Sequence, residues 1–240
     1  MNVYVVSDFH LKFKEAQIDL ERREKVINFL DSIQDKADML VLNGDIFDLW
    51  FVWNDFIIKN YFPVLIKLFQ LRLKGVRIVF IAGNHDFWFK NFLTDTMGIE
   101  VYREDFFEII DGVKTFISHG DKYTTNDLRY QIFRKMIRNK FMMWLFGSLH
   151  PNLALKIGSN MSRSSRKKQI AKNELNKREQ GLIKFAKEKL KVVDRVILGH
   201  SHLPKIEHYK NGTYANAGDW ITHFSYLQIT NGKIELLFYK

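Results

Sequence analysis

Short apolar runs alternate with helical patterns over the first half of the chain. Runs rich in β-branched and aromatic residues predict buried strands at residues 1–7, 38–43 and 76–82. Between them, apolar positions recur at helical spacing over residues 20–33 and 56–74, and a shorter helix is expected at residues 92–97. This alternation is typical of an α/β protein.

The second half of the chain has a different pattern. Strands are predicted at residues 106–110 and 114–118, on either side of the hairpin signal Asp111-Gly112. Residues 127–191 are helical in pattern almost throughout, and short strands then return at residues 193–198, 206–209, 213–217, 225–230 and 233–238. Asn211-Gly212 and Asn231-Gly232 suit tight turns between these strands. We therefore expect two packed sheets with helices outside them, and one domain over residues 1–240 with a helical insertion at residues 122–191.

Composition narrows the class of protein. The 240 residues suffice for one domain with a sizeable core, and 46% hydrophobic and 27% charged residues are ordinary for a soluble protein. The absence of cysteine excludes disulfides, zinc–thiolate sites and cysteine nucleophiles. No signal peptide is expected, because Asp8 and His10 interrupt the first apolar run. The longest apolar stretches are too short to span a membrane.

The positive charge is concentrated in the helical insertion. The chain carries a net charge of +10, yet residues 122–191 hold 18 Lys and Arg against 4 Asp and Glu. The rest of the chain is slightly acidic. A local positive field indicates an anionic partner, which could be a nucleic acid, a phospholipid surface or a phosphorylated substrate. For any single stretch, a solvated basic helix face is the alternative.

Potential metal ligands follow five of the apolar runs. They lie in the blocks Asp8-Phe9-His10, Gly44-Asp45-Ile46-Phe47-Asp48, Gly83-Asn84-His85-Asp86, His119-Gly120-Asp121 and Gly199-His200-Ser201-His202. Carboxylate, amide and imidazole groups suit hard or borderline divalent cations, and two such cations need about seven ligands. The blocks contain five of the eight histidines. Strand-end groups of this kind predict a two-metal hydrolase.

Spacing within the blocks suggests individual roles. Residues two apart share one face of a strand, so Asp8 and His10 can reach one metal, and His200 and His202 have the same spacing after Gly199. Asp45 follows a glycine, where the chain can turn sharply and present a bridging carboxylate. We expect Asp48 to orient a ligand instead of binding metal itself. Each block taken alone is also compatible with a polar turn at the surface.

The block at residues 83–86 is the most specific of the five. Asn84 can ligate a metal through its amide oxygen without adding negative charge. His85 can then face the substrate, and Asp86 is expected to hold the His85 ring and stabilise its protonated form. The remaining histidines lie outside such blocks and are interpreted as structural or surface residues; they are His150, His208 and His223.

These five blocks, in this order, resemble the calcineurin-like metallophosphoesterases over residues 1–121 and again from residue 194 onward. The resemblance implies a two-sheet αββα sandwich and hydrolysis of a phosphate bond by a water activated by two metals. It also implies that Asp45 bridges two sets of ligands, which are Asp8, His10 and His202 for one metal, and Asn84, His119 and His200 for the other. Manganese suits such mixed nitrogen and oxygen ligands, with iron and zinc as alternatives.

A closer resemblance, to the UDP-2,3-diacylglucosamine hydrolase family of lipid A synthesis, includes the insertion. It rests on residues 7–11, 44–50, 119–121, 126–127, 130–134 and 218–220, with Ser165 and Lys172. It implies cleavage of a pyrophosphate to UMP and 2,3-diacylglucosamine 1-phosphate, and an insertion that forms a lid over the acyl chains. The implied substrate contacts are Asn84, His85, Asp127, Ser165, Gln169, Lys172 and His200.

The chain departs from that family at two positions. His85 stands where well-known members have Arg, and Gln169 stands where they have Asn or Thr. His85 is, however, the residue that the broader superfamily uses as leaving-group acid or charge stabiliser. Two alternatives therefore remain: a phosphoesterase acting on another nucleotide or phosphodiester, and a nucleic-acid-binding module that uses the basic segment.

The insertion also carries an apolar patch at residues 141–146. Basic residues flank it, namely Arg134, Lys135, Arg138 and Lys140. A basic amphipathic segment of this kind can rest on an anionic leaflet, or it can pack on the core, and both can hold together. Together with the resemblance, this favours a lipid-bearing phosphorylated substrate over nucleic acid, and a cytoplasmic protein at the inner-membrane surface.

Overall fold

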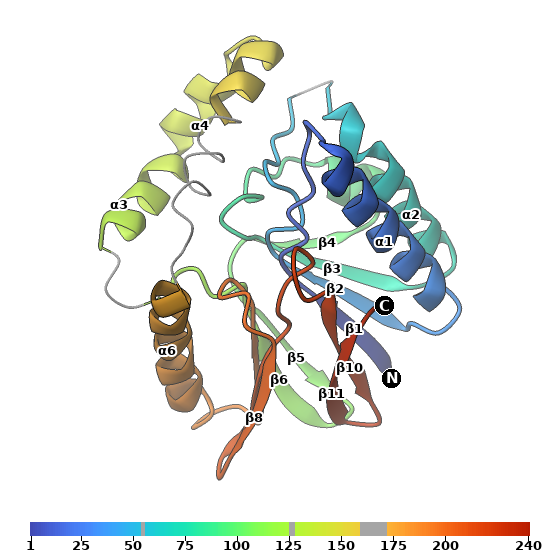
Figure 1. Ribbon diagram of the computed structural model, residues 1–240, viewed down its shortest axis with the longest axis vertical. Coiled ribbons are helices and arrows are strands. Elements are labelled where there is room, and N and C mark those ends of the chain that lie inside the picture. The colour runs from blue at the N-terminus through green and yellow to red at the C-terminus, as the bar shows by residue number, and fades with distance from the viewer. Residues whose placement is uncertain (54–55, 125–127, 159–171) are drawn as a thin grey trace.

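The computed structural model describes residues 1–53, 56–124, 128–158 and 172–240. Two sheets face each other in it (Figure 1). The first has the order β11-β10-β1-β2-β3-β4, with bounds β1 (Asn2–Val6), β2 (Met39–Asn43), β3 (Arg77–Ile81), β4 (Glu100–Tyr102), β10 (Ser225–Thr230) and β11 (Lys233–Phe238). The second has the order β5-β6-β7-β9-β8, with bounds β5 (Phe106–Ile110), β6 (Val113–Ile117), β7 (Arg195–Leu198), β8 (Lys205–Tyr209) and β9 (Gly212–Asn216).

Alternation along the strands separates the inner core from the outer ones. Val3 and Val5 of β1 belong to the core between the sheets, whereas Tyr4 and Val6 belong to the core under the helices. Helices α1 (Gln17–Ile33) and α2 (Phe62–Leu73) cover the outer face of the first sheet, and α6 (Lys172–Lys189) packs on the outer face of the second. This confirms the predicted αββα sandwich.

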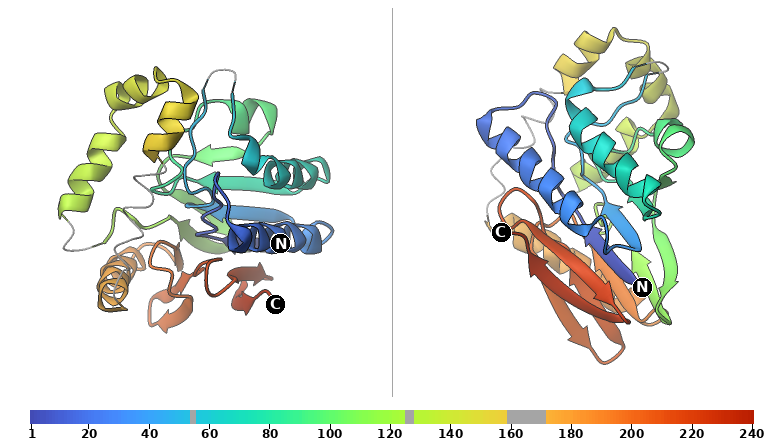
Figure 2. Two further views of the ribbon diagram at one scale, coloured as in Figure 1. Left: turned by 45° about the horizontal axis from the view of Figure 1, so that its top comes forward. Right: turned by 90° about the vertical axis from the view of Figure 1, so that its right-hand side faces the viewer.

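The helical insertion divides into two parts. Helices α3 (Leu128–Ile137) and α4 (Lys140–Gly147) and the helical residues 151–158 lie together at one end of the molecule, beyond the sheets (Figures 1 and 2). By contrast, α6 is a structural layer, because Leu182 and Ala186 are fully buried against the second sheet. Helix α6 therefore belongs to the sandwich itself.

Local differences from the predicted elements have local causes. The helix predicted from residue 56 begins at Phe62, after the 3₁₀ turn Lys59–Tyr61, and Pro63 in its first turn favours that start. The three-residue strand β4 gives no readable alternation and was not predicted. Turns at Asp111-Gly112 and Asn231-Gly232 have positive φ at both positions, as predicted. Between β8 and β9, pairing of Tyr209 with Gly212 shifts the turn to Lys210-Asn211.

Among the helices that the structure describes, none combines the length and the apolar content that crossing a bilayer requires.

Candidate two-metal site

The five predicted blocks meet at one edge of the sandwich. They follow β1, β2 and β3 in the first sheet and β6 and β7 in the second, and these strands run parallel within their sheets. Two hydrogen bonds join the sheets there: Asn43 Nδ2 donates to the carbonyl of Ser118 (3.1 Å), and His119 Nδ1 donates to the carbonyl of Asn43 (3.0 Å). Parallel strands have their carboxyl ends at the same edge of a sheet, so the potential metal ligands that follow these strands lie together at that edge.

The backbone is strained where ligands leave the strands. Asp8, His10, Asp45, His200 and His202 all have positive φ, between 46° and 65°. Non-glycine residues rarely adopt this region, and each such residue costs on the order of 1–3 kcal/mol unless its surroundings enforce it. Backbone bonds between the loops enforce it here, including one from the His10 N–H to the Asp45 carbonyl (2.9 Å). The strain aims these side chains at a common point.

The first group of ligands consists of Asp8, His10 and His202. Oδ1 of Asp8 lies 3.2 Å from His202 Nε2 and 3.5 Å from His10 Nε2. Asp8 Oδ1 and His10 Nε2 are buried, and neither makes a hydrogen bond to a described residue. Buried polar atoms without partners are costly. These donor atoms therefore fit a cation that would satisfy them together.

The second group of ligands consists of Asp45, His119, His200 and Asn84. His119 Nε2 lies 3.4 Å from Asp45 Oδ2 and 3.2 Å from Asn84 Oδ1. Because His119 Nδ1 faces a backbone carbonyl, it keeps its proton, and loss of the proton on Nε2 provides a lone pair for a metal.

Asp45 lies between the two groups. Its Oδ2 is 3.4 Å from His119 Nε2 and 3.7 Å from His10 Nε2, whereas its Oδ1 accepts the backbone N–H of His85 (2.9 Å). One oxygen, and not both, thus faces the two groups. With seven donors arranged in this way, the residues fit a pair of divalent cations.

Negative charge dominates the electrostatics of the site. Burial lowers the pKa of His10 and of His119, but the carboxylates of Asp48 and Asp8 beside His10, and of Asp45 and Asp8 beside His119, raise each to about 10. Burial, with the charge of neighbouring His119, lowers the pKa of His200 to about 3. A site that raises imidazole pKa values this far attracts cations strongly.

The structure corrects the role predicted for Asp86. Its carboxylate accepts the backbone N–H groups of Gly83, Asp45, Ile46 and Phe47, at 2.6–3.1 Å. The prediction that Asp86 holds the ring of His85 is therefore wrong: both oxygens tie the loop after β2 to the loop after β3.

Asp48 takes the place beside His85 that was predicted for Asp86. His85 Nδ1 lies 3.0 Å from the Asp48 carbonyl, and the Asp48 carboxylate lies 3.7 Å from His10 Nδ1. The His85 ring stands perpendicular to that of His10, with centroids 5.0 Å apart. His85 is thus at the edge of the metal-ligand cluster, half-buried, and available to a substrate.

Not all predicted substrate contacts can be placed. Asn84, His85 and His200 lie in the cluster. Asp127, Ser165 and Gln169 lie outside the described residues. Lys172 begins α6, and its side chain also lies outside what the structure describes.

Sequence reasoning missed Asp219, which contacts two histidines. Its Oδ2 lies 4.0 Å from His202 Nδ1 and 2.6 Å from His223 Nδ1. His223 is therefore not an isolated surface residue. The available signal was position, because Gly218-Asp219 follows β9 as the other blocks follow their strands.

Two arginines also reach the site, Arg134 of α3 and Arg138 directly after it. Arg134 Nε donates to Asp121 Oδ2 (2.5 Å), and Arg138 Nη2 donates to the carbonyl of Gly83 (2.9 Å) while its guanidinium stacks on the ring of Phe87. The sequence suggested that both flank a surface patch. Instead they attach α3 to two of the ligand-bearing loops.

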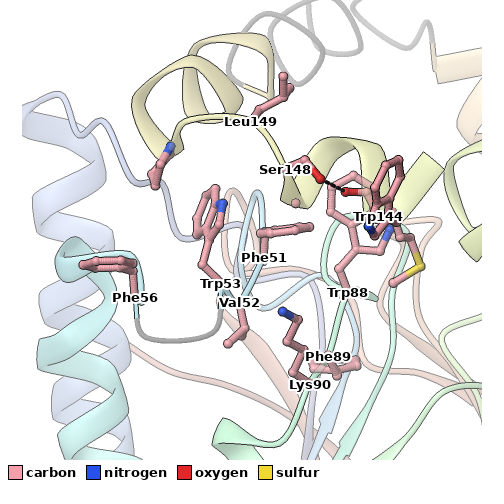
Figure 3. Close-up of a pocket in the computed structure, with 13 residues that line it drawn as sticks. Phe51, Val52, Trp53, Phe56, Trp88, Phe89, Lys90, Trp144, Ser148 and Leu149 are labelled. Atoms are coloured by element: carbon pink, nitrogen blue, oxygen red, sulfur yellow. Dashed lines mark hydrogen bonds between the residues drawn. The ribbon is translucent and has the colours of Figure 1, made fainter. Parts of the chain in front are cut away.

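An apolar cavity of about 580 Å³ opens between α4 and the loops that continue from Asp48 and His85 (Figure 3). Aromatic side chains dominate its walls, among them Phe51, Trp53, Phe56, Trp88, Phe89 and Trp144. The inner face of α4 closes it, with Phe146 packed on Phe51 and Trp88 at ring distances of 5.0 and 4.6 Å. Part of the patch at residues 141–146 therefore packs on the core, as one of the two interpretations held.

Comparison with known proteins agrees with this site. The model of the calcineurin-like phosphoesterase family matches residues 1–204. UDP-2,3-diacylglucosamine hydrolases from Porphyromonas gingivalis and a Shewanella species are 27% and 31% identical, covering 93% and 98% of this chain and 92% and 97% of the relatives. A solved archaeal phosphodiesterase, 14% identical, covers 99% of both chains with a TM-score of 0.51 and shares the fold. The chain belongs to the calcineurin-like phosphoesterase family and is a hydrolase.

Proposed function

We propose that this hydrolase cleaves the pyrophosphate bond of UDP-2,3-diacylglucosamine, giving UMP and 2,3-diacylglucosamine 1-phosphate for lipid A synthesis. One observation carries the proposal: a two-metal ligand cluster lies next to a large apolar cavity. A substrate with a pyrophosphate at one end and two acyl chains at the other matches that pairing. Near end-to-end similarity to relatives of that name supports it.

The ligand groups would hold two cations, with Mn²⁺ proposed because the donors mix imidazole with carboxylate and amide oxygen. Asp8, His10 and His202 form one set and Asn84, His119 and His200 the other, with Asp45 between them. When bound, such cations lower the pKa of water and stabilise charge on a phosphoryl group. Loops locked by Asp86 keep the ligands in place.

His85 acts on the substrate in this scheme. Its Nδ1 faces a carbonyl and carries a proton, so Nε2 is the nitrogen that can donate to a phosphoryl oxygen when the ring is doubly protonated. The leaving group is a phosphate, whose second pKa of about 6 makes protonation unnecessary near neutral pH. We therefore assign His85 to charge stabilisation instead of acid catalysis, the role that Arg would have at the same position.

The cavity would receive the acyl chains, and α3, α4 and residues 151–158 would form the lid over them. Its aromatic walls supply the apolar surface that desolvated chains need. We retain Asp127, Ser165, Gln169 and Lys172 as proposed contacts to the head group, on the strength of the family resemblance.

The outer face of α4 would rest on the anionic leaflet that holds such a substrate. Phe141 and Leu145, one turn apart and outside the cavity lining, are 64% and 44% exposed. Lys135 and Lys140 are exposed beside them. Aromatic side chains at the headgroup level with nearby lysines are typical of interfacial helices. The protein would thus work at the cytoplasmic surface of the inner membrane.

The decisive experiment compares the acylated substrate with its deacylated form. The Mn²⁺-loaded protein is incubated with UDP-2,3-diacylglucosamine and with UDP-glucosamine, and UMP release is measured; Asp45→Asn serves as the background control. We expect kcat/KM to favour the acylated substrate by at least about 100-fold, as burial of long apolar chains implies.

His85 motivates one competing function, a phosphoesterase for another nucleotide or phosphodiester. A panel that adds bis(p-nitrophenyl) phosphate and cyclic nucleotides tests it. Efficient hydrolysis of one of these, with no UMP from the acylated substrate, would overturn the proposal and support the alternative.

A further inference from the structure

Glu179 is a buried carboxylate that α6 directs at the metal-ligand loop. It is 3% exposed and receives two hydroxyl donors, Ser201 Oγ at 2.5 Å and Tyr214 Oη at 3.0 Å. Lys205 Nζ lies 3.5 Å from it and is partly exposed. By contrast, Glu188 on the same helix is exposed and pairs only with Lys191 among the described residues.

Ser201 is the residue between His200 and His202. These two histidines belong to different ligand groups and both have left-handed backbone, with φ of 65° and 59°. The intervening serine is fully buried, so its hydroxyl lies inside the protein, beneath a strained loop. A group that holds Ser201 Oγ therefore also restricts the backbone of His200 and His202 on either side of it.

The hydroxyl of Ser201 is completely satisfied by protein groups. It donates to Glu179 and accepts from Asn216 Nδ2 (2.9 Å), which also donates to the Gly199 carbonyl (3.1 Å). A fully connected buried network fixes one arrangement, whereas a half-satisfied one is costly. Packing alone does not account for Glu179, since its neighbours Leu182 and Ala186 show that apolar residues fill this helix face.

We propose that Glu179 is a positioning residue for the metal centre. Through Ser201 it fixes the orientation of His200 and His202, and it thereby links α6 to both ligand groups. This inference rests on the two-metal site of the proposed function. Groups that orient metal ligands typically contribute 10- to 100-fold to metal affinity.

Mn²⁺ titration calorimetry on metal-free protein tests this without relying on activity. We expect Glu179→Ala and Ser201→Ala each to weaken Mn²⁺ binding by about 10- to 100-fold. The double variant should be no weaker than the worse single variant, because both remove one link. Glu179→Gln, which can still bond both hydroxyls, should restore most of the affinity, and Glu188→Ala should match wild type.

The outcomes separate the two proposals. Wild type that binds fewer than two Mn²⁺ would overturn the two-metal site, whatever the variants do. Wild type that binds two, with affinities unchanged in Ser201→Ala and Glu179→Ala, would overturn the positioning role alone. If Glu179→Ala does not fold in chelator, as judged by circular dichroism, Ser201→Ala decides the matter, because it removes a single hydroxyl.

Discussion

The carboxylates of Asp45 and Asp86 have different roles in this site because their oxygens have different partners. Asp45 keeps Oδ2 facing the two ligand groups, since only Oδ1 is bonded to a backbone N–H. Both oxygens of Asp86 are occupied by backbone N–H groups. Burial and the charge of Asp45 raise the pKa of Asp86, and the N–H donors oppose that rise. A carboxylate held in this way is a scaffold for the loops.

The first residue-scale prediction concerns His85. We expect His85→Ala to lower kcat by about 10- to 1,000-fold, because one donor to transition-state charge is lost. His85→Arg should recover at least a tenth of wild-type activity, since guanidinium donates hydrogen bonds and carries charge. Steady-state UMP release gives both numbers, with Mn²⁺ affinity measured in parallel.

The Arg variant distinguishes two roles for His85. Arginine keeps its proton at any working pH, so it can stabilise charge but cannot act as a general acid. An Arg variant as slow as the Ala variant would therefore contradict charge stabilisation and favour proton transfer. His208→Ala, on exposed β8, is the matched control and should be silent.

The sequence alone predicted the metal ligands better than the residues that hold those ligands in position. The i, i+2 spacing predicted that Asp8 and His10 lie together, and the positions at strand ends predicted the other ligands. In the structure these ligands form neighbouring groups. Three of the four partners of Asp86 are backbone N–H groups 39 to 41 residues away, which no side-chain pattern reports. Glu179 was missed for the same reason, because its partners Ser201 and Tyr214 lie 22 and 35 residues away in the chain.

At the scale of elements, α4 has two apolar faces with different neighbours. Phe146, Met143 and Trp144 face the core and the cavity, whereas Phe141 and Leu145 do not line the cavity and are 64% and 44% exposed. The sequence alone shows only that residues 141–146 place apolar side chains on every side of the helix. Such a helix on a monomer needs a partner on its outer side.

We predict that the outer face of α4 binds anionic membranes. Phe141→Ser combined with Leu145→Ser should reduce co-sedimentation with phosphatidylglycerol vesicles by at least tenfold, because two exposed apolar side chains of this face are lost. UMP release from substrate dispersed in detergent should stay near wild type. Binding to neutral phosphatidylcholine vesicles should be weaker throughout, and salt should weaken the anionic case.

The control pair is Phe107→Ser with Ile109→Ser, which removes two exposed apolar side chains from β5, away from the insertion. Equal loss in both pairs would indicate general surface hydrophobicity, and no loss in the α4 pair would contradict the membrane face.

Strands and hairpins were predictable because their signals are local. Asp111-Gly112 and Asn231-Gly232 form the turns that their sequence predicts, whereas pairing of Tyr209 with Gly212 moves the third turn by one residue. The division of the insertion was not predictable, because α6 carries a basic and apolar mixture, as α3 does. Only tertiary contacts show that Leu182 packs on the second sheet, while Arg134 of α3 and Arg138 directly after it reach the ligand loops.

At the scale of the whole molecule, a basic insertion lies over an acidic site. The carboxylates of that site should make Mn²⁺ binding depend on pH, because they raise the pKa values of two ligand histidines. In the metal-free protein His10 and His119 have pKa values raised to about 10, so both are protonated at pH 7 and each must lose a proton to bind metal. His200, with its pKa lowered to about 3, is already neutral. We expect about two protons released from these residues, measured by calorimetry in buffers of different ionisation enthalpy.

The sign of the effect differs between the metal-free and the loaded protein. A raised pKa means that protonated His10 and His119 stabilise the metal-free fold below the unfolded value of about 6.5, and this stabilisation is lost as pH rises through about 10. Mn²⁺ competes with those same protons, so its affinity, and the stability that it adds by mass action, should rise over that window. Thermal unfolding from pH 6.5 to 10, in chelator and in excess Mn²⁺, should therefore show the stabilisation by metal widening with pH. A constant difference would mean that the two histidines bind metal without giving up protons, and that the carboxylates around them do not raise their pKa values.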